Sequence, residues 1–294
     1  MRLPPTVLAV VYQNFTPVAS RARAVTVVHD LIFLTDPGQF SRVERSYLGL
    51  IARLLPRAAV VAAVSEHVRS VVLDQWPTRD PTSVVVAPNG VDEGLLMAGS
   101  TVPDAAAEQA VRSAYGIKRP YIFYLGRINV RKNLVGLMEG FAMARLPDHQ
   151  LVLAGRRDGV GVDVLGHSER LGISDRVRQL GEVPWSDLPA LFRGADAFAY
   201  VSFDEGFGVP PLEAMAFGIP VVCSEIPALL ETAGPGGALI VAHDPEAIAH
   251  GLERAVNDTS VRTSARQLGP AQAARYRWRD TATAIRAALE AAAA

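Results

Sequence analysis

Two carboxylates with a loop of small residues between them mark the stretch of this sequence best suited to binding a ligand. Glu205 opens a loop that contains two glycines, and Glu213 follows Pro210 and Pro211, which suit the first turn of a helix because the missing N–H of proline costs nothing there. Such a loop leaves backbone N–H groups and the positive end of a helix dipole facing outward, where an anionic or hydroxyl-rich ligand binds. A carboxylate there can accept two hydroxyl protons at once, as in the binding of a sugar ring or a ribose. The alternative is a solvated loop charge at Glu205 and an ordinary first-turn residue at Glu213.

Two cationic side chains lie in a second loop, between an apolar run of strand length and a helix start. Arg127 follows the run Tyr121–Leu125, and Lys132 directly precedes Asn133, whose side chain suits a helix N-cap. Ligands bind in open α/β sheets at the carboxyl ends of the strands, so both cations are expected to point into one crevice. Arginine offers a planar fork and lysine a mobile point charge, which together suit a diphosphate. The alternative is a solvated basic turn.

One histidine ends another apolar run, and several other kinds of site have no counterpart in the sequence. His29 closes the run Ala24–His29 and is expected at a strand's carboxyl edge, facing a crevice between domains. A locally satisfied polar residue is the alternative, because imidazole readily finds hydrogen bonds nearby. No group of His, Cys, Asp and Glu has metal-ligand spacing, and neither a D-x-D pair nor a G-x-S-x-G motif occurs. We therefore expect no metal site and no serine nucleophile.

Composition bounds the class of protein. The chain has 294 residues, 49% of them hydrophobic, which is enough for two domains with sizeable cores. The net charge is -1 with both signs interspersed, so no nucleic-acid footprint is expected. The single cysteine, Cys223, lies in an apolar run and is interpreted as a core residue in a reducing compartment. The apolar run near the start is shorter than a membrane span and is interpreted as a strand, so a cytoplasmic protein is predicted, with peripheral membrane contact as an option.

The elements that must position these residues alternate between strands and helices. Strand-length apolar runs without alternation are typical of parallel sheets covered on both faces. Four of them precede the expected linker at Gly94–Pro103, and six follow it. The runs are Thr6–Tyr12, Ala24–His29, Ala58–Val64, Ser83–Ala87, Tyr121–Leu125, Gln150–Ala154, Val177–Leu180, Ala197–Val201, Ile219–Cys223 and Ala238–Val241. The sequence therefore predicts an α/β protein with a doubly wound sheet in its second half.

Helix starts are marked by capping residues. Ser41 and Glu44 form a capping-box pattern before an amphipathic helix, and Ser65, Asn133, Ser186 and Asp244 are expected to cap others. The first of these helices carries arginines at 42, 45, 53 and 57, which are predicted to form a solvated face, with contact to an anionic membrane surface as the alternative. A final helix is expected to begin at Trp278.

These residues resemble the motifs of a known family. The segment 202–224 is similar to the E-x7-E segment of the group 1 glycosyl transferases (glycosyltransferase family 4), and Gly126–Asn133 is similar to that family's G-R-x-x-x-x-K-N motif. His29 and Asp30 resemble its HD motif, and the resemblance covers nearly the whole chain. It implies the GT-B fold, two facing Rossmann-like domains: residues 1–103 on the acceptor side, residues 104–276 binding the nucleotide sugar, and a helix over 277–294 that crosses back to the first domain.

The resemblance also implies roles. Arg127 and Lys132 would hold the nucleotide diphosphate, Glu205 and His29 would contact the donor sugar, and Glu213 would bind the ribose in a retaining, metal-independent transfer. Further nucleotide-sugar contacts would come from Gly126, Gly155, Arg156, Val183, Phe207, Gly208, Val209 and Leu212. Gly155 is equally an ordinary strand-ending turn. The implied donor is GDP-mannose, the acceptor a glycan or lipid-linked glycan of polysaccharide biosynthesis, and no cofactor is implied.

The sequence departs from the family's pattern in its N-terminal part. Relatives carry several strand-helix units before the HD strand, whereas only Thr6–Tyr12 precedes it here. We therefore expect a shortened first domain, weak transfer, and self-association through an exposed sheet edge. The alternatives to a transferase are a nucleotide-sugar-binding fragment with impaired catalysis, or another GT-B enzyme such as an epimerase or a phosphorylase. No pyridoxal-binding lysine of the kind a phosphorylase needs can be identified.

Overall fold

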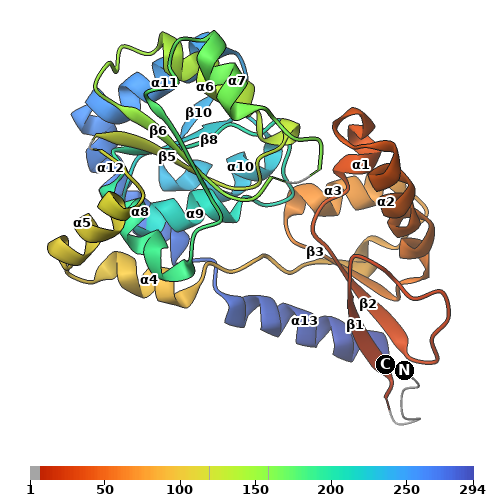
Figure 1. Cartoon of the computed structure of the whole chain (residues 1–294). Helices are drawn as coiled ribbons and strands as arrows, with labels where there is room; N and C mark the ends of the chain where they lie inside the picture. Colours follow the sequence, from red (N-terminus) through yellow and green to blue (C-terminus); the bar gives the residue numbers. More distant parts are fainter. Residues whose placement is uncertain (1–6, 119, 158) are drawn as a thin grey trace. The chain divides into compact units, whose positions relative to one another are not determined.

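The chain divides into two compact units, each with its own parallel sheet (Figure 1). The computed structural model describes residues 7–118, 120–157 and 159–294. Unit 1 comprises the chain up to Gly90, the loop segment Glu205–Phe207 and the C-terminal segment Tyr276–Ala294. Unit 2 comprises Val91–Asp204 and Gly208–Arg275.

Unit 1 is built on four parallel strands in the order β1-β2-β3-β4. They are β1 (Ala9–Gln13), β2 (Arg23–Val28), β3 (Val60–Ala63) and β4 (Val84–Val86). The four strands predicted from β-branched apolar runs are thus confirmed, although residue 6 of the first run lies outside the described residues. The central strands β2 and β3 are buried almost throughout, as expected for a sheet covered on both faces.

Unit 1 has four helices among the described residues, and all but the first, which was not predicted, begin where the sequence predicts. They are α1 (Ile32–Thr35), α2 (Arg42–Leu54), α3 (Glu66–Gln75) and α13 (Trp278–Ala293), with short 3-10 turns η1 (Pro37–Gln39), η2 (Leu55–Arg57) and η3 (Pro81–Ser83). The capping box of Ser41 and Glu44 forms at the start of α2, and Ser65 caps α3 by accepting from Val68 N–H. Helix α13 packs along β1, β2 and β3, so the two ends of the chain belong to one core.

Unit 2 is a doubly wound sheet of six parallel strands in the order β10-β9-β8-β5-β6-β7. The strands are β5 (Tyr121–Leu125), β6 (Gln150–Ala154), β7 (Val177–Gly181), β8 (Ala197–Tyr200), β9 (Val221–Ser224) and β10 (Leu239–Val241). The strand order reverses between β5 and β8, which makes that pair the topological switch point. Cys223 is fully buried in β9, and burial raises the pKa of its thiol to about 12. Its interpretation as a core residue is confirmed.

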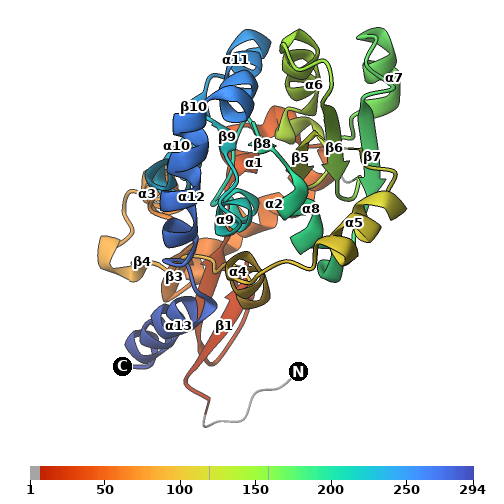
Figure 2. The same ribbon diagram turned by 90° about the vertical axis from the view of Figure 1, so that its left-hand side faces the viewer.

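Helices cover both faces of this sheet (Figure 2), with α6, α7 and α11 on one face and α8, α9 and α12 on the other. The helices are α4 (Glu93–Ser100), α5 (Ala105–Ala114), α6 (Leu134–Met143), α7 (Val164–Arg170), α8 (Leu188–Gly194), α9 (Val209–Ala216), α10 (Pro227–Thr232), α11 (Pro245–Asn257) and α12 (Thr259–Ala273), with 3-10 turns η4 (Val130–Lys132), η5 (Trp185–Asp187) and η6 (Gly234–Gly236). Asn133 and Asp244 cap α6 and α11 as predicted. Ser186 does not cap α8, because it lies inside η5 and its hydroxyl donates to Asp187.

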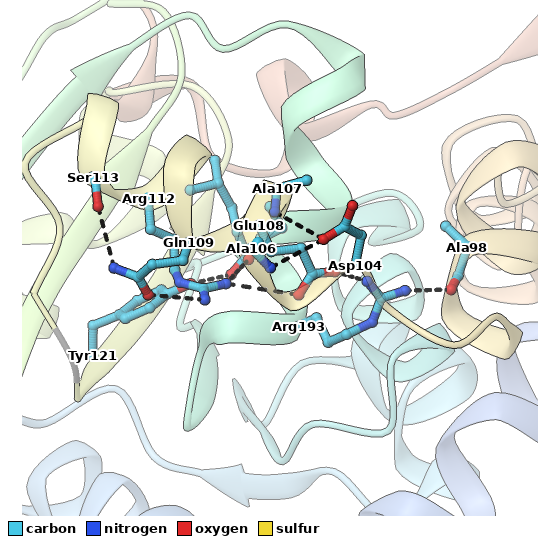
Figure 3. Close-up of polar contacts among 12 residues, drawn as sticks. Ala98, Asp104, Ala106, Ala107, Glu108, Gln109, Arg112, Ser113, Tyr121 and Arg193 are labelled. Atoms are coloured by element: carbon cyan, nitrogen blue, oxygen red, sulfur yellow. Dashed lines mark hydrogen bonds and ion pairs between the residues drawn. The ribbon is translucent and has the colours of Figure 1, made fainter.

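The expected linker at Gly94–Pro103 is wrong, since residues 93–100 form α4 within unit 2. This helix shows no clear periodicity because it is rich in small residues, and a Cβ at Gly99 would overlap the backbone of α9. Polar contacts fix the neighbouring α5 to α8 (Figure 3): Arg193 pairs with Glu108 and donates to the carbonyl of Ala98, and Arg112 donates to the carbonyl of Ala190 at 3.3 Å. Close backbone packing and these arginine contacts hold α4 and α5 in unit 2.

Two kinds of feature are absent from the described residues. No helix in the ranges 7–118, 120–157 and 159–294 has the length and apolar character needed to cross a membrane. Within the same ranges, no three His, Cys, Asp or Glu side chains come close enough together to hold a metal ion.

Candidate functional site

The carboxyl ends of β5, β6 and β7 are joined by glycine backbone contacts. Gly126 N–H donates to the Ala154 carbonyl at 3.0 Å, and Gly155 N–H donates to the Gly181 carbonyl at 2.7 Å. Gly155 has a φ of 136°, and a Cβ there would overlap the carbonyl oxygen of Gly126. Only glycine fits, because a side chain would push the β5 and β6 loops apart. This packing holds the loops after β5, β6 and β7 together at the carboxyl edge of the sheet.

Lys132 reaches the switch point from the loop after β5. Its side chain is only 5% exposed, and its Nζ donates to the hydroxyl of Tyr200 at 2.7 Å while lying 4.8 Å from the centre of that ring. Tyr200 is the last residue of β8, so Lys132 bridges the two strands between which the order reverses. Arg127, in the same loop, is exposed, and its carbonyl accepts from the hydroxyl of Tyr124 at 2.7 Å. The predicted cations thus lie on one loop, with one side chain buried and the other exposed.

Two further residues expected to contact the nucleotide sugar follow β6 and β7. Arg156 directly follows Gly155, and its exposed side chain lies 3.7 Å from the carboxylate of Glu182. Val183 is half-buried in the loop after β7. The Ile128 N–H donates to the carbonyl of Arg156 at 2.8 Å, so the loops after β5 and β6 run together.

The loop after β8 leads into α9 as the proline pair predicts. Gly208 is the N-cap in a left-handed conformation, with a φ of 94°, and a Cβ there would overlap the side chain of Leu229. Pro210 and Pro211 lie in the first turn of α9. Val209, its first residue, is half-buried, whereas Leu212 is fully buried, so the side chain of Leu212 belongs to the core.

Glu213 is a buried carboxylate on α9, 5% exposed. Among the described residues no side chain or backbone group forms a hydrogen bond or ion pair with it. Burial, and secondly the negative charge of Asp92, raises the pKa of its carboxyl to about 7. A desolvated carboxylate is costly unless a donor reaches it, which is why the carboxyl of Glu213 holds its proton more tightly than an exposed glutamate does.

Three of the predicted site residues belong to unit 1: His29, Glu205 and Phe207. Glu205 is 6% exposed, and a Cβ at the adjacent Gly206 would overlap the carbonyl oxygen of His29. The Gly206 carbonyl accepts from the hydroxyl of Ser65 at 2.6 Å. The segment Glu205–Phe207 therefore packs directly on the end of β2, next to His29.

His29 and Phe207 are both held by neighbours within unit 1. The Nε2 of His29 lies 2.9 Å from the Gln13 amide oxygen. Burial lowers the pKa of His29 against the raising effect of Asp30, which keeps the ring neutral at pH 7. Phe207 packs edge-to-face on Tyr276, with ring centres 5.3 Å apart.

Sequence reasoning missed Tyr200, the partner of Lys132, and assigned no role to Arg131. Tyr200 is part of an apolar strand run, and the signal that was available is the position of a hydroxyl at the carboxyl end of that strand. Arg131 lies between two residues of the motif, and its side chain contacts the loop after β8.

Comparisons with known proteins identify the family of this chain. The family model described as "Glycosyl transferases group 1" matches residues 108–272. The chain is 32% identical over 268 residues to an O-antigen chain mannosyltransferase B of Escherichia coli, covering 89% of this chain and 68% of that protein. It is 31% identical over 255 residues to a D-inositol 3-phosphate glycosyltransferase of Salinispora arenicola (strain CNS-205), covering 80% of this chain and only 56% of that protein.

Solved structures share the fold at low identity. A crystal structure of Anabaena Alr3699/HepE in complex with UDP and glucose aligns with a TM-score of 0.75 at 22% identity, over 92% of this chain and 72% of that one. The crystal structure of WaaG, a glycosyltransferase involved in lipopolysaccharide biosynthesis, aligns with a TM-score of 0.74 at 16% identity, over 97% of this chain and 77% of that one.

Proposed function

Since the chain belongs to the group 1 glycosyl transferases and has the Rossmann-like domains of the GT-B fold, we propose that it transfers a hexose from a nucleotide diphosphate sugar to a glycan or lipid-linked acceptor. The observation that carries the proposal is the pairing of Lys132 with Tyr200 at the switch point of unit 2, where α/β sheets bind nucleotides. We assign donor binding to unit 2 and the acceptor side to unit 1.

The proposed mechanism uses protein charges on the leaving group. Lys132 and Arg127 stabilise the negative charge that develops on the departing diphosphate, and the acceptor hydroxyl attacks from the same face, which retains the anomeric configuration. Glu205 accepts hydrogen bonds from sugar hydroxyls. The neutral His29, which follows β2 and packs against the segment Glu205–Phe207, also contacts the sugar. The carboxylate of Glu213 accepts from the ribose hydroxyls.

The proposed donor is GDP-mannose. Two curated relatives from Escherichia coli are named as mannosyltransferases: the O-antigen chain mannosyltransferase B and the serotype-specific mannosyltransferase WbdA, the latter at 27% identity. UDP-glucose is the competing donor, because HepE, whose fold is shared, has been crystallised with it. Gly126, Gly155, Arg156 and Val183 would line the base, and Phe207, Gly208, Val209 and Leu212 would shape the loop beside the sugar.

A thermal-shift panel tests the function. The chain is heated with GDP-mannose, UDP-glucose, GDP, UDP and guanosine, and a ligand at 100 times its Kd should add about 2.7 kcal/mol of stability. We expect the largest shift with GDP-mannose, followed by release of mannose to water or to an acceptor. Shifts with the nucleotide sugars but no release would identify a binding protein without turnover. An absence of any nucleotide-dependent shift would contradict the proposal.

Activity should survive removal of divalent metals. Two protein cations already face the diphosphate in the proposed complex, so a metal ion would duplicate their effect. Release of the sugar from the donor, measured with and without EDTA, is expected to proceed at the same rate. Full loss with EDTA and recovery with Mg²⁺ or Mn²⁺ would show that the cations do not suffice.

Exposed apolar side chains and arginines on helix α2 of unit 1 support contact with an anionic membrane surface. On α2, Val43, Tyr47 and Leu50 follow one another at helical spacing and are all exposed, with the side chain of Val43 79% exposed. Arginines at 42, 45 and 53 lie on the same helix. An amphipathic helix with apolar side chains and several arginines binds at an anionic lipid interface, where a lipid-linked acceptor would be found.

Sedimentation with lipid vesicles tests this contact. The chain should sediment with vesicles that contain phosphatidylglycerol and remain in solution with pure phosphatidylcholine, and Tyr47→Ser should weaken sedimentation by about 10-fold through lost apolar burial. Leu165→Ser, at an exposed apolar position of α7 in unit 2, is the matched control and should change nothing. Equal sedimentation of Tyr47→Ser and the unmodified chain would rule out α2 as the contact.

A further inference from the structure

Arg131 holds the loop after β8 by two different groups. Its backbone carbonyl accepts from Phe203 N–H at 2.9 Å, and its Nη1 donates to the carbonyl of Asp204, also at 2.9 Å. These contacts fix two successive residues of the loop, directly before Glu205. A loop that contains two glycines has little conformational preference of its own, so such contacts determine its course.

The residue before this pair, Ser202, is also fixed, by residues at the end of β9 and after β10, the strands that lie beyond β8 in the sheet order. The carbonyl of Ser202 accepts from Ser224 Oγ at 2.5 Å, at the end of β9, and from His243 Nε2 at 3.0 Å, after β10. The ring of His243 lies 5.3 Å from that of Phe203. Three successive backbone positions, 202 to 204, are therefore held by residues far away in the sequence.

The three residues 131 to 133 each connect the β5 loop to a different neighbour. Arg131 binds the loop after β8, Lys132 binds Tyr200 at the end of β8, and Asn133 donates to the carbonyl of His243 at 3.4 Å. The side chain proposed to hold the diphosphate is thus adjacent, along one backbone, to the side chain that holds the loop leading to Glu205.

We propose that Arg131 is a positioning residue for the donor sugar. It fixes Phe203 and Asp204, the two residues before Glu205, beside the loop that carries Lys132, and so sets where the segment that leads to Glu205 begins. This inference rests on the proposed function, because it gives Glu205 and Lys132 their roles. Arg131 itself acts through the Asp204 carbonyl and does not touch the donor.

Hydrogen exchange in the ligand-free protein tests, without any substrate, whether Arg131 fixes the loop after β8. Loss of one charge-assisted hydrogen bond corresponds to about 10-fold or more in an opening equilibrium. Amides of residues 202–208 should therefore exchange at least about 10-fold faster in Arg131→Ala than in the unmodified chain. Arg131→Lys, which keeps a cationic donor, should recover much of the protection. Arg145→Ala, at an exposed position before β6, is the matched control and should not change this segment.

Binding separates positioning from direct contact. In Arg131→Ala, affinity for the nucleotide diphosphate should stay within about twofold, while affinity for the nucleotide sugar and kcat for sugar release each fall by about 10-fold. Unchanged exchange and kcat would overturn the inference, and so would an equal loss for both ligands, which would make Arg131 a diphosphate ligand. A chain that bound no nucleotide sugar would instead overturn the proposed function. The exchange result would still show whether Arg131 fixes the loop after β8.

Discussion

Replacing Glu213 with glutamine should stabilise the ligand-free protein by about 3 kcal/mol at pH 8 and by less than about 1 kcal/mol at pH 5. Burial and the charge of Asp92 raise the pKa of the Glu213 carboxyl from 4.5 to about 7 in the folded protein. Between these values the folded protein keeps a proton that the unfolded chain has lost, so stability falls as the pH rises from 4.5 to 7. Glutamine has no proton to lose, and the variant escapes this fall.

Urea unfolding between pH 5 and 8 measures the effect. The free energy of unfolding of the unmodified chain should fall over this range relative to that of Glu213→Gln, and Asp92→Asn should show an intermediate fall, since asparagine still caps α4 but removes the charge. Glu225→Gln, at an exposed position after β9, is the control and should follow the unmodified chain. Parallel pH profiles for Glu213→Gln and the unmodified chain would mean that ionisation of the Glu213 carboxyl does not destabilise the folded protein.

If Glu213 binds the ribose as proposed, nucleotide binding should depend on pH. Ribose hydroxyls donate to the ionised form, so binding should favour the carboxylate, release a proton near pH 6.5, and tighten as the pH rises through 7. Calorimetry in two buffers with different ionisation enthalpies counts the released protons. In Glu213→Gln, both the proton release and the pH dependence should disappear. Proton release that persists in the variant would assign it to another group.

Replacing Lys132 with alanine should weaken binding of the nucleotide diphosphate by about 10- to 100-fold, because charge-assisted contacts are worth about 1.5–3 kcal/mol each. Transfer should fall further, by about 100-fold or more, since the charge on the leaving group grows in the transition state. Affinity for the nucleoside, which has no phosphate, should stay nearly constant. Calorimetry with the nucleoside and the diphosphate gives the comparison, and an equal loss for both would remove Lys132 from the diphosphate site.

Two variants separate this effect from structural damage. Tyr200→Phe removes the hydroxyl that accepts from Lys132 but keeps the ring beneath the ammonium group, so the diphosphate should still bind. Glu205→Gln should spare the bare diphosphate and weaken only the nucleotide sugar. A loss of diphosphate affinity in Glu205→Gln equal to that in Lys132→Ala would contradict the separate roles of the two residues.

The sequence by itself determined the strands and the starts of several helices. Uninterrupted β-branched runs predicted the strands of both sheets, and Ser41, Asn133 and the pair Pro210–Pro211 predicted helix starts that the structure has. These features depend on neighbouring residues: a cap binds an N–H two or three positions away, and proline fixes its own backbone. The motifs at Gly126–Asn133 and around Glu205 were visible for the same reason, since each is a continuous segment.

Only the tertiary structure decided which residues of these segments meet and which are buried. Helix α4 was not predicted, because its small residues carry no periodic signal and owe their place to close packing on α9. The raised pKa of Glu213 follows from burial and from Asp92, which is 121 positions away in the sequence. Lys132 meets Tyr200, and Arg131 meets Asp204, across more than sixty residues. The contacts of Lys132 and Arg131 form where the strand order reverses. That order is a property of the folded sheet rather than of any local run of residues.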